Sequence, residues 1–392
     1  MLLTEQETLR RILDATEPLI TEELPVSEAR DRVLGETIFA RIPLPAFNNS
    51  SMDGYAVIAG EVQPGKRLAV VGEQSAGFDR RLQIDPGTAV RIFTGAPLPA
   101  GADAVLMQED AERIGDEIVA RTSLQSGENV RLRGGDLCQG QKMIEAGSRL
   151  NPQRLALLAS QGLNRLNVYR RPQVSVVTTG SELRKPGAPL GPGEIYETNG
   201  IMISGLVRQS GGVPVEFDPI PDNEEAHARI LTEALRSDVL VVAGGVSVGE
   251  KDLVKPILQK LGAKIELWRV AIRPGKPFLF GRLGSKLIFG LPGNPVSAYV
   301  TFVIFVRPAL LRLQGGREEP NTRAKLVAGH TIRNDGDRPH YLRVRVAGNS
   351  FVLVGRQESH ALFALSQADA LVRLEPKQEV PEGKVVEALL IN

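Results

Sequence analysis

The chain has 392 residues, with 47 basic and 46 acidic side chains and a formal net charge of +1. A chain of this length is expected to form two to four domains, and its balanced charge argues against a nucleic-acid or membrane-surface role for the protein as a whole. The single cysteine, Cys138, excludes an internal disulfide and a cysteine-based zinc site.

Two features of the sequence predict a cytoplasmic protein that does not enter a membrane. The N-terminal sequence MLLTEQETLRRILD has acidic residues where a signal peptide would have a basic and then an apolar run. The longest apolar stretch, 296–306, stops at Arg307 and Pro308, and we expect it to be too short to span a bilayer.

The first 170 residues predict two helices that flank a β-rich region. Thr4 and Glu7 form a capping box at the start of an amphipathic helix, and a later Asn-Pro pair is typical of the start of a second helix. Between the helices, short apolar runs alternate with clusters of Gly, Pro and Asp, which is typical of β-structure. We therefore expect an inserted β-rich domain at 27–140, and a discontinuous helical linker domain at 1–26 and 141–170 in which the two helices pair.

The remaining chain predicts an α/β domain followed by more β-structure. At 171–316, apolar runs such as 174–178 and 239–242 are typical of strands buried on both faces. These runs alternate with helical patterns, which indicates a mainly parallel sheet within three layers. At 317–392, alternating apolar and polar residues predict a small C-terminal β-barrel or sandwich. The fold class is therefore α/β plus β, in several domains.

Two glycine-rich loops in the α/β region predict an anion site. Strand 239–242 runs into GGVSVG at 244–249, and a second apolar run ends in LPGNP at 291–295, where Asn294 is expected to cap a helix and Pro295 to start it. Such loops offer backbone N–H groups to an anion at the C-terminal ends of strands. Either loop alone would be interpreted as an ordinary turn, because neither has a Walker A or G-x-G-x-x-G sequence.

Three cations lie between these loops in the sequence, namely Arg269, Arg273 and Lys276. Arg269 and Arg273 are four residues apart, so we expect them to project from one face of one strand and to bind an oxyanion. The alternative is that they belong to a solvated face. Together with the two loops, the three cations favour a site for a polyanionic ligand.

Five acidic residues lie in loops rich in Gly, Ser or Thr, where a carboxylate can bind Mg²⁺ near a polyphosphate or position a water molecule. They are Asp53, Asp136, Glu182, Asp222 and Asp252. Capping of the following helix explains Asp222 fully. For Asp252, capping of the next helix is an equal alternative to a role in the site, whereas Glu182 and Asp53 start no obvious helix. Thr94 offers a hydroxyl at a strand end, where the alternative is an ordinary turn residue. The four histidines show no metal-ligand spacing.

Seven motifs occur in order along the chain: NNSSMDGYAV, RIFTGAPLPAGADAV, GENVRLRGGD, TTGSEL, GGVSVGEKD, RPGKP and LPGNPVSA. With these motifs the sequence closely resembles the molybdopterin molybdenumtransferases, the family of bacterial MoeA and the gephyrin C-terminal domain, over essentially its whole length. The resemblance implies an elongated homodimer with a composite active site, a C-terminal β-barrel, and a reaction that converts adenylylated molybdopterin and molybdate to molybdenum cofactor and AMP with Mg²⁺.

The resemblance also implies roles for individual residues. The implied catalytic residues are Asp53, Thr94, Glu182 and Asp252, and the implied metal ligands are Asp136, Asp222 and Asp252. The implied substrate-binding residues are Gly244, Gly245, Ser247, Arg269, Arg273, Lys276, Pro292, Asn294, Pro295, Arg343 and Ser359. The chain departs from the family pattern at four positions, because arginines stand at 269 and 273 in place of lysines, Ser181 replaces an acidic residue, and Asn48 replaces an aspartate.

The chemistry fits these residues. Molybdate and a phosphoanhydride repel each other, and cations with loop N–H groups offset that repulsion. A metal held by carboxylates polarises the anhydride, so no protein nucleophile is needed.

Two alternatives remain open at this point. The α/β domain could be a molybdopterin adenylyltransferase, which has the same fold; the motifs around Asp53 and Thr94 argue against it, because that enzyme is a single α/β domain. The chain could instead be a non-enzymatic scaffold of the gephyrin type, although its carboxylates and cations exceed what a scaffold needs. A molybdopterin adenylyltransferase is also a possible partner protein.

Overall fold

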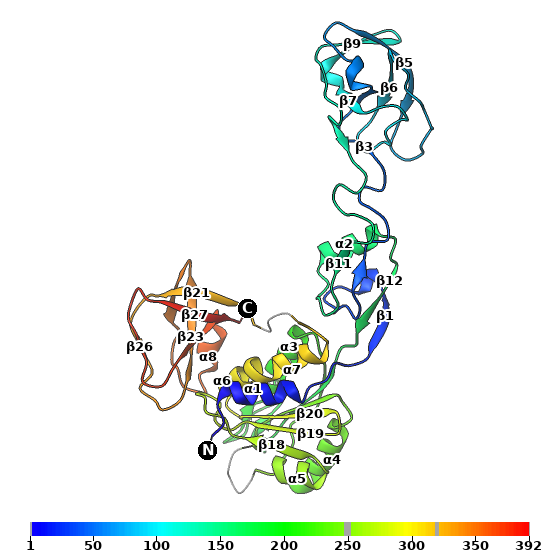
Figure 1. Cartoon of the computed structure of the whole chain (residues 1–392). Coiled ribbons are helices and arrows are strands. Elements are labelled where there is room, and N and C mark those ends of the chain that lie inside the picture. The colour runs from blue at the N-terminus through cyan, green and yellow to red at the C-terminus, as the bar shows by residue number, and fades with distance from the viewer. Residues whose placement is uncertain (1, 247–251, 318–320, 392) are drawn as a thin grey trace. The chain divides into compact units, whose positions relative to one another are not determined.

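The computed structural model describes residues 2–246, 252–317 and 321–391 (Figure 1). The chain forms two compact units. The larger unit consists of Met1–Glu36, Ala146–Ala156 and Asn164–Asn392. The smaller unit consists of Thr37–Glu145 and Leu157–Leu163.

The larger unit contains a mainly parallel sheet, as the sequence predicted. Its strands are β13 (Gln173–Thr178), β16 (Val213–Glu216), β17 (Val239–Ala243), β18 (Lys264–Trp268), β19 (Leu279–Leu283) and β20 (Lys286–Leu291). They run in the order β16-β13-β17-β20-β19-β18. The first four pair in parallel, whereas β19 is antiparallel to β20 and β18 is antiparallel to β19.

Helices cover both faces of this sheet, which gives three layers (Figure 1). They are α1 (Glu5–Asp14), α3 (Asn199–Gln209), α4 (Glu224–Ala234), α5 (Val254–Lys260), α6 (Pro295–Thr301) and α7 (Arg307–Leu313). In β17, Val239 and Val241 pack with α1, α3, α6 and α7, whereas Leu240 and Val242 pack with α4 and α5. Because successive side chains of a strand point to opposite faces, a strand covered on both sides must be apolar throughout.

The helix after β20 is longer than the sequence predicted. It continues from α6 through a π-helical turn, η4 (Phe302–Val306), into α7, so Pro295–Leu313 forms one helix of 19 residues. A π-helical turn before Pro308 accommodates a residue that has no backbone N–H, so the proline does not end the helix. The expectation that this stretch is too short to span a bilayer was therefore wrong, because length and composition would allow it. However, 83% of its most apolar window is buried inside the protein.

The first helix begins as predicted but packs elsewhere. The Thr4 hydroxyl accepts a hydrogen bond from the Glu7 N–H at 3.2 Å. Ile12 belongs to the core of the α/β domain, so α1 does not form the expected helical pair with α2 (Pro152–Ser160). An apolar stripe predicts burial but does not select the partner. The two passages of the linker are joined instead by antiparallel strands, β1 (Thr21–Pro25) and β12 (Arg165–Tyr169).

The C-terminal region forms a closed barrel, which resolves the choice between barrel and sandwich. Its strands, in spatial order, are β21 (Arg323–Ala328), β24 (Ser350–Leu353), β23 (His340–Ala347), β25 (Ala370–Leu374) and β27 (Val385–Leu390). Leu342, Val344 and Phe351 are among the side chains that fill it. Outside the barrel, β22 (Ile332–Arg333) pairs with β26 (Glu379–Val380), and a short helix, α8 (Leu362–Ser366), precedes β25.

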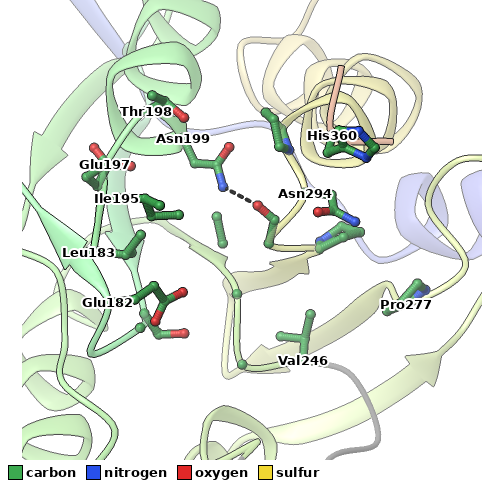
Figure 2. Close-up of a pocket in the computed structure, with 18 of the residues that line it drawn as sticks. Glu182, Leu183, Ile195, Glu197, Thr198, Asn199, Val246, Pro277, Asn294 and His360 are labelled. Carbon is green, nitrogen blue, oxygen red and sulfur yellow. Dashed lines mark hydrogen bonds between the residues drawn. The ribbon is translucent and has the colours of Figure 1, made fainter. Parts of the chain in front are cut away.

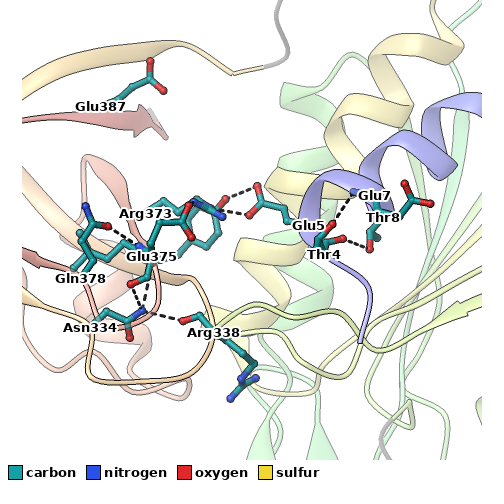
Figure 3. A network of polar contacts seen from close by, with 12 residues as sticks. Thr4, Glu5, Glu7, Thr8, Asn334, Arg338, Arg373, Glu375, Gln378 and Glu387 are labelled. Atoms are coloured by element: carbon teal, nitrogen blue, oxygen red, sulfur yellow. Dashed lines mark hydrogen bonds and ion pairs between the residues drawn. The ribbon is translucent and has the colours of Figure 1, made fainter. Parts of the chain in front are cut away.

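Hydrogen bonds fasten the barrel to the α/β domain (Figure 3). Glu5, the first residue of α1, accepts one bond from the Tyr341 hydroxyl at 2.7 Å and one from the Arg373 Nε at 2.9 Å. Burial raises the pKa of Tyr341, so this hydroxyl remains a donor. A second attachment lies nearer the sheet, where the Arg273 N–H donates to the Pro339 carbonyl at 2.8 Å. The barrel is therefore held at two separate points.

The smaller unit is built on a second sheet, in the order β7-β4-β6-β5-β9-β8. Its strands are β4 (Gly54–Val57), β5 (Arg67–Gln74), β6 (Thr88–Ile92), β7 (Ala104–Met107), β8 (Ala111–Ile114) and β9 (Glu117–Ala120). Short pairs also form between β2 (Ile38–Phe39) and β11 (Lys142–Ile144) and between β3 (Asn49–Ser50) and β10 (Val130–Arg131). Both faces of the main sheet carry apolar cores.

Candidate functional site

A cavity of about 720 Å³ lies at the C-terminal ends of the parallel strands (Figure 2). Figure 2 shows Glu182, Leu183 and Ile195 on one side of it and Asn294 and His360 on the other. The loops after β13, β17 and β20 all contribute lining residues. This is the position that the sequence predicted for a ligand of the sheet.

The glycine-rich loop after β17 has the backbone shape that the sequence indicated. Gly244 and Gly245 both have positive φ, at 95° and 64°. A Cβ on Gly244 would lie 2.8 Å from both the carbonyl and the hydroxyl oxygen of Thr179. Only glycine allows the backbone at 244 to come this close to Thr179. The cavity wall at this place is therefore made of backbone atoms. Ser247, which was predicted to bind substrate, lies outside the described residues.

Carboxylates line the large cavity. Glu182, Glu197, Asp222 and Asp252 all contribute to its wall, and among the described residues no Lys or Arg does. The Glu182 carboxylate folds over Gly180, where an added Cβ would lie 2.6 Å from one of its oxygens. Burial raises the pKa of Glu197, whose carboxylate accepts the Gly200 N–H at the start of α3.

The capping interpretation of Asp222 was wrong. Asn223 caps α4, because its side-chain oxygen accepts the Ala226 N–H at 2.8 Å. The Asp222 carboxylate instead accepts the Ser181 N–H at 3.3 Å, and the Asp222 N–H donates to the Ser181 hydroxyl at 2.9 Å. This reciprocal pair joins two loops of the cavity. Asp252 also lines the cavity, and Leu253 holds the N-cap position of α5.

Two asparagines cross-link the cavity wall. Asn294 holds the N-cap position of α6, as predicted, but its side chain makes no capping bond and donates to the Ser359 hydroxyl at 2.9 Å. The Asn199 amide donates to the Gly293 carbonyl at 2.7 Å (Figure 2), while its side-chain oxygen is buried without a partner. The sequence reasoning missed Asn199, although it follows Thr198 at the start of a helix, where a polar residue faces the strand ends.

A second cavity, of about 460 Å³, adjoins the first and carries positive charge. Arg273, Lys276 and Arg338 line it together with Ser359. We call it the cationic pocket. It shares Pro277, Pro292, Asn294 and His360 with the large cavity. Sequence reasoning predicted Arg273, Lys276, Ser359 and the loop at 291–295, but it missed Arg338, which lies in a turn of the C-terminal region.

The expectation that Arg269 and Arg273 share one strand face was wrong. β18 ends at Trp268, and Arg269 has a positive φ of 82°, so the two arginines do not continue a regular strand. The Arg269 guanidinium lies over the Trp268 ring, 4.8 Å from its centroid. Arg269 lines neither cavity, whereas Arg273 lines the cationic pocket.

Arg343 lies behind the cationic pocket and does not line it. Its side chain is fully buried, and one nitrogen donates to the carbonyls of Arg356 and Glu358, at 2.6 and 3.2 Å. Its other two guanidinium nitrogens are buried without a partner, and burial lowers its pKa. Arg343 therefore supports the loop that carries Ser359 and adds buried positive charge next to the pocket.

The other predicted catalytic residues lie in the smaller unit. The Asp53 carboxylate accepts both the N–H and the hydroxyl of Thr94, at 2.8 and 2.7 Å. These bonds hold the pKa of Asp53 below its usual value. The structure thus brings Asp53 and Thr94 together at the ends of β4 and β6. Asp136 is exposed in the loop after β10.

Among the described residues, no three His, Cys, Asp or Glu side chains form a cluster that could hold a metal ion. Mg²⁺ is commonly held by one or two carboxylates and by substrate phosphates. The carboxylates of the large cavity fit that mode of binding, which needs no protein cage.

Three family models match successive parts of the chain. Residues 3–162 match the MoeA N-terminal region (domain I and II), residues 175–312 match a probable molybdopterin binding domain, and residues 325–391 match the MoeA C-terminal region (domain IV).

Similar proteins extend over almost the whole chain. A molybdopterin molybdenumtransferase of Haemophilus influenzae is 36% identical and covers 98% of this chain and 98% of its own. Molybdopterin molybdenumtransferase 2 of Mycobacterium tuberculosis is 34% identical and covers 97% of this chain and 95% of its own. The crystal structure of a molybdopterin biosynthesis MoeA protein from Pyrococcus horikoshii has a TM-score of 0.87 and 28% identity and covers 100% of both chains.

Proposed function

This chain belongs to the MoeA family of molybdopterin molybdenumtransferases, and from that premise we propose that it converts adenylylated molybdopterin and molybdate to molybdenum cofactor and AMP. One observation carries the proposal. The acidic large cavity and the cationic pocket share a wall, so two substrates of different charge and size can meet there. The adenylyltransferase and scaffold alternatives account for the large cavity alone.

The large cavity is assigned to the molybdopterin substrate. Its volume of about 720 Å³ suits a pterin with its phosphate. The Gly244 N–H donates to the Leu291 carbonyl at 3.0 Å, which fixes the loop against the end of β20. The loop lies at the strand ends, where a phosphate is well stabilised. Pro292 and Pro295 fix the shape of the opposite loop, and Asn199 offers an unpaired oxygen to the N–H groups of a pterin.

The cationic pocket is assigned to molybdate, which is a small dianion. Arg273, Lys276 and Arg338 supply charge, and the Ser359 hydroxyl supplies a neutral donor. The buried Arg343 adds to the positive potential without contacting the pocket. Arginine at 273 presents a planar fork of donors, which suits two oxygens of one oxyanion.

Mg²⁺ is assigned to the large cavity, where Glu182, Asp222 and Asp252 would hold it together with a substrate phosphate. The ion would polarise the phosphoanhydride and neutralise charge on the departing phosphate. The Glu182 carboxylate lies against Gly180 of its own loop. We assign Glu182 to binding the ion or to positioning the attacking water.

We also assign the protein to the cytoplasm as a homodimer, in which Asp53, Thr94 and Asp136 serve the site of the partner subunit. Mixing the inactive variants Asp53→Ala and Asp252→Ala by joint refolding tests this. Random pairing yields about half mixed dimers, in which one site is intact, so roughly a quarter of all sites should work. No activity from a confirmed mixed dimer would contradict shared sites.

The main experiment supplies adenylylated molybdopterin, Mg²⁺ and molybdate and follows both AMP release and molybdenum incorporation. We expect AMP release to depend on molybdate and to match the molybdenum incorporated. A product formed from ATP and molybdopterin in the absence of molybdate would support the adenylyltransferase alternative instead.

A further inference from the structure

One titratable side chain stands in the wall between the two cavities. Four residues line both of them: Pro277, Pro292, Asn294 and His360. Two are prolines, and an amide does not exchange a proton at neutral pH. Histidine is a common proton acceptor and donor in active sites, so His360 is the shared residue suited to proton transfer.

The backbone of His360 is fixed while its ring remains available. The carbonyl of Ser359 accepts the Val296 N–H at 3.1 Å, and that of His360 accepts the Leu362 N–H at 2.8 Å. Arg343 supports the same loop from within the barrel. Over the described part of the chain, no protein group forms a hydrogen bond with the imidazole, which is exposed at the edge of the large cavity (Figure 2).

The proposed reaction needs a proton carrier at this place. When a dithiol binds molybdate, two Mo–S bonds form and one Mo–O bond breaks, and the two thiol protons leave with the departing oxygen as water. No oxidant or reductant takes part. The thiols belong to the ligand assigned to the large cavity and the oxygen belongs to the ligand assigned to the cationic pocket, so the protons move between the two cavities, past the four residues that line both.

We propose that His360 transfers the two protons in turn, taking each from a thiol of the pterin ligand and delivering it to the oxygen that leaves molybdenum as water. This role rests on the proposed function and adds a catalytic residue that the sequence reasoning set aside, because the histidines showed no metal-ligand spacing. The cations of the same pocket, Arg273, Lys276 and Arg338, hold the oxyanion beside His360, and Glu358 is the one acidic residue among the described lining.

The test compares His360→Gln with wild type in single turnovers, with molybdenum incorporation and AMP release followed separately. We expect molybdenum incorporation to slow by about a hundredfold, while the molybdate concentration for half-maximal rate changes little. His330→Gln is the matched control, because His330 lies in the barrel region and lines neither cavity; it should behave as wild type.

Rescue by a small molecule separates proton transfer from mere support of the wall. In His360→Ala, added imidazole should restore incorporation in proportion to its concentration. A wild-type rate in His360→Gln, or a slow His360→Ala that imidazole does not rescue, would overturn the role of His360. A wild-type protein that neither incorporates molybdenum nor releases AMP would instead refute the proposed function itself.

Discussion

The two adjoining cavities differ in the charge of the residues that line them. The large cavity has a wall of glycine backbone and carboxylates, without a Lys or Arg among the described residues. The smaller one has three cations, Arg273, Lys276 and Arg338, against one carboxylate, Glu358. A wall of carboxylates repels a phosphorylated ligand unless a metal ion accompanies it, and a wall of cations attracts a bare oxyanion. This difference in charge would let each of two anionic substrates bind selectively in its own cavity before the two react.

Removal of a carboxylate from the large cavity should have the largest effect. We expect Glu182→Ala to slow AMP release by on the order of a hundredfold or more, because a metal or water contact is lost, without loss of the fold. Asp218→Ala, at an exposed carboxylate that pairs with Lys185, serves as the control. Near-normal AMP release from folded Glu182→Ala would remove the carboxylate from the chemistry.

Removal of a cation from the smaller cavity should act on molybdate alone. We expect Arg273→Ala to raise the molybdate concentration for half-maximal rate by roughly tenfold, which is the loss of one charge-assisted hydrogen bond. Arg269→Ala should have a much smaller effect, because Arg269 stacks on Trp268 and lines neither cavity. Equal changes in the two variants would mean that long-range charge, not contact, binds the oxyanion.

The close approach of Gly244 to Thr179 can be tested by adding a Cβ atom at position 244. Gly244→Ala should lower the free energy of unfolding by about 1–3 kcal/mol, because it combines a positive φ with a Cβ only 2.8 Å from two Thr179 oxygens. Gly187→Ala is the matched control, since Gly187 has a similar φ of 92° and open space around it. Denaturant unfolding of both measures the clash separately from the strain. Equal losses would show that the close approach to Thr179 costs nothing.

The last prediction concerns the dependence of stability on pH. Burial, with the charges of Arg273, Arg343 and Arg338, lowers the pKa of His340 to about 4 from its ordinary value of 6.5. The folded protein then binds fewer protons than the unfolded chain between these values, so its stability falls as pH drops through that window. Thermal unfolding from pH 7 to pH 4 should show this loss, and His340→Gln should reduce it. An unchanged slope in the variant would assign the acid sensitivity to other groups.

Local patterns predicted the fold well and the cavity in part. The apolar run of β17 and the glycines after it specify a buried strand and a turn within a few residues, so both were confirmed, as was the cap at Thr4. Side-chain partners were harder, because they come from elsewhere in the chain. Asp222 pairs with Ser181, and Asn294 reaches Ser359 in the barrel.

Position relative to a cavity was the least predictable property. Arg269 and Arg273 looked equivalent in sequence. In the structure Arg269 has a positive φ and lies over Trp268, whereas Arg273 lines the cationic pocket. His360 was set aside because a metal site was the only role considered, and no sequence spacing shows that a loop lies between two cavities.

The attachment of Glu5 to the barrel sets an order for biogenesis. Its bonds to Tyr341 and Arg373 join positions 336 and 368 residues apart, so they can form only after nearly all of the chain has left the ribosome. Contacts of such long sequence separation are slow to form. The loop with Ser359 and His360 lies between Tyr341 and Arg373 in the sequence, so its contributions to both cavities also come from the last part of the chain to be made. Neither cavity is therefore complete before the C-terminal region has been synthesised.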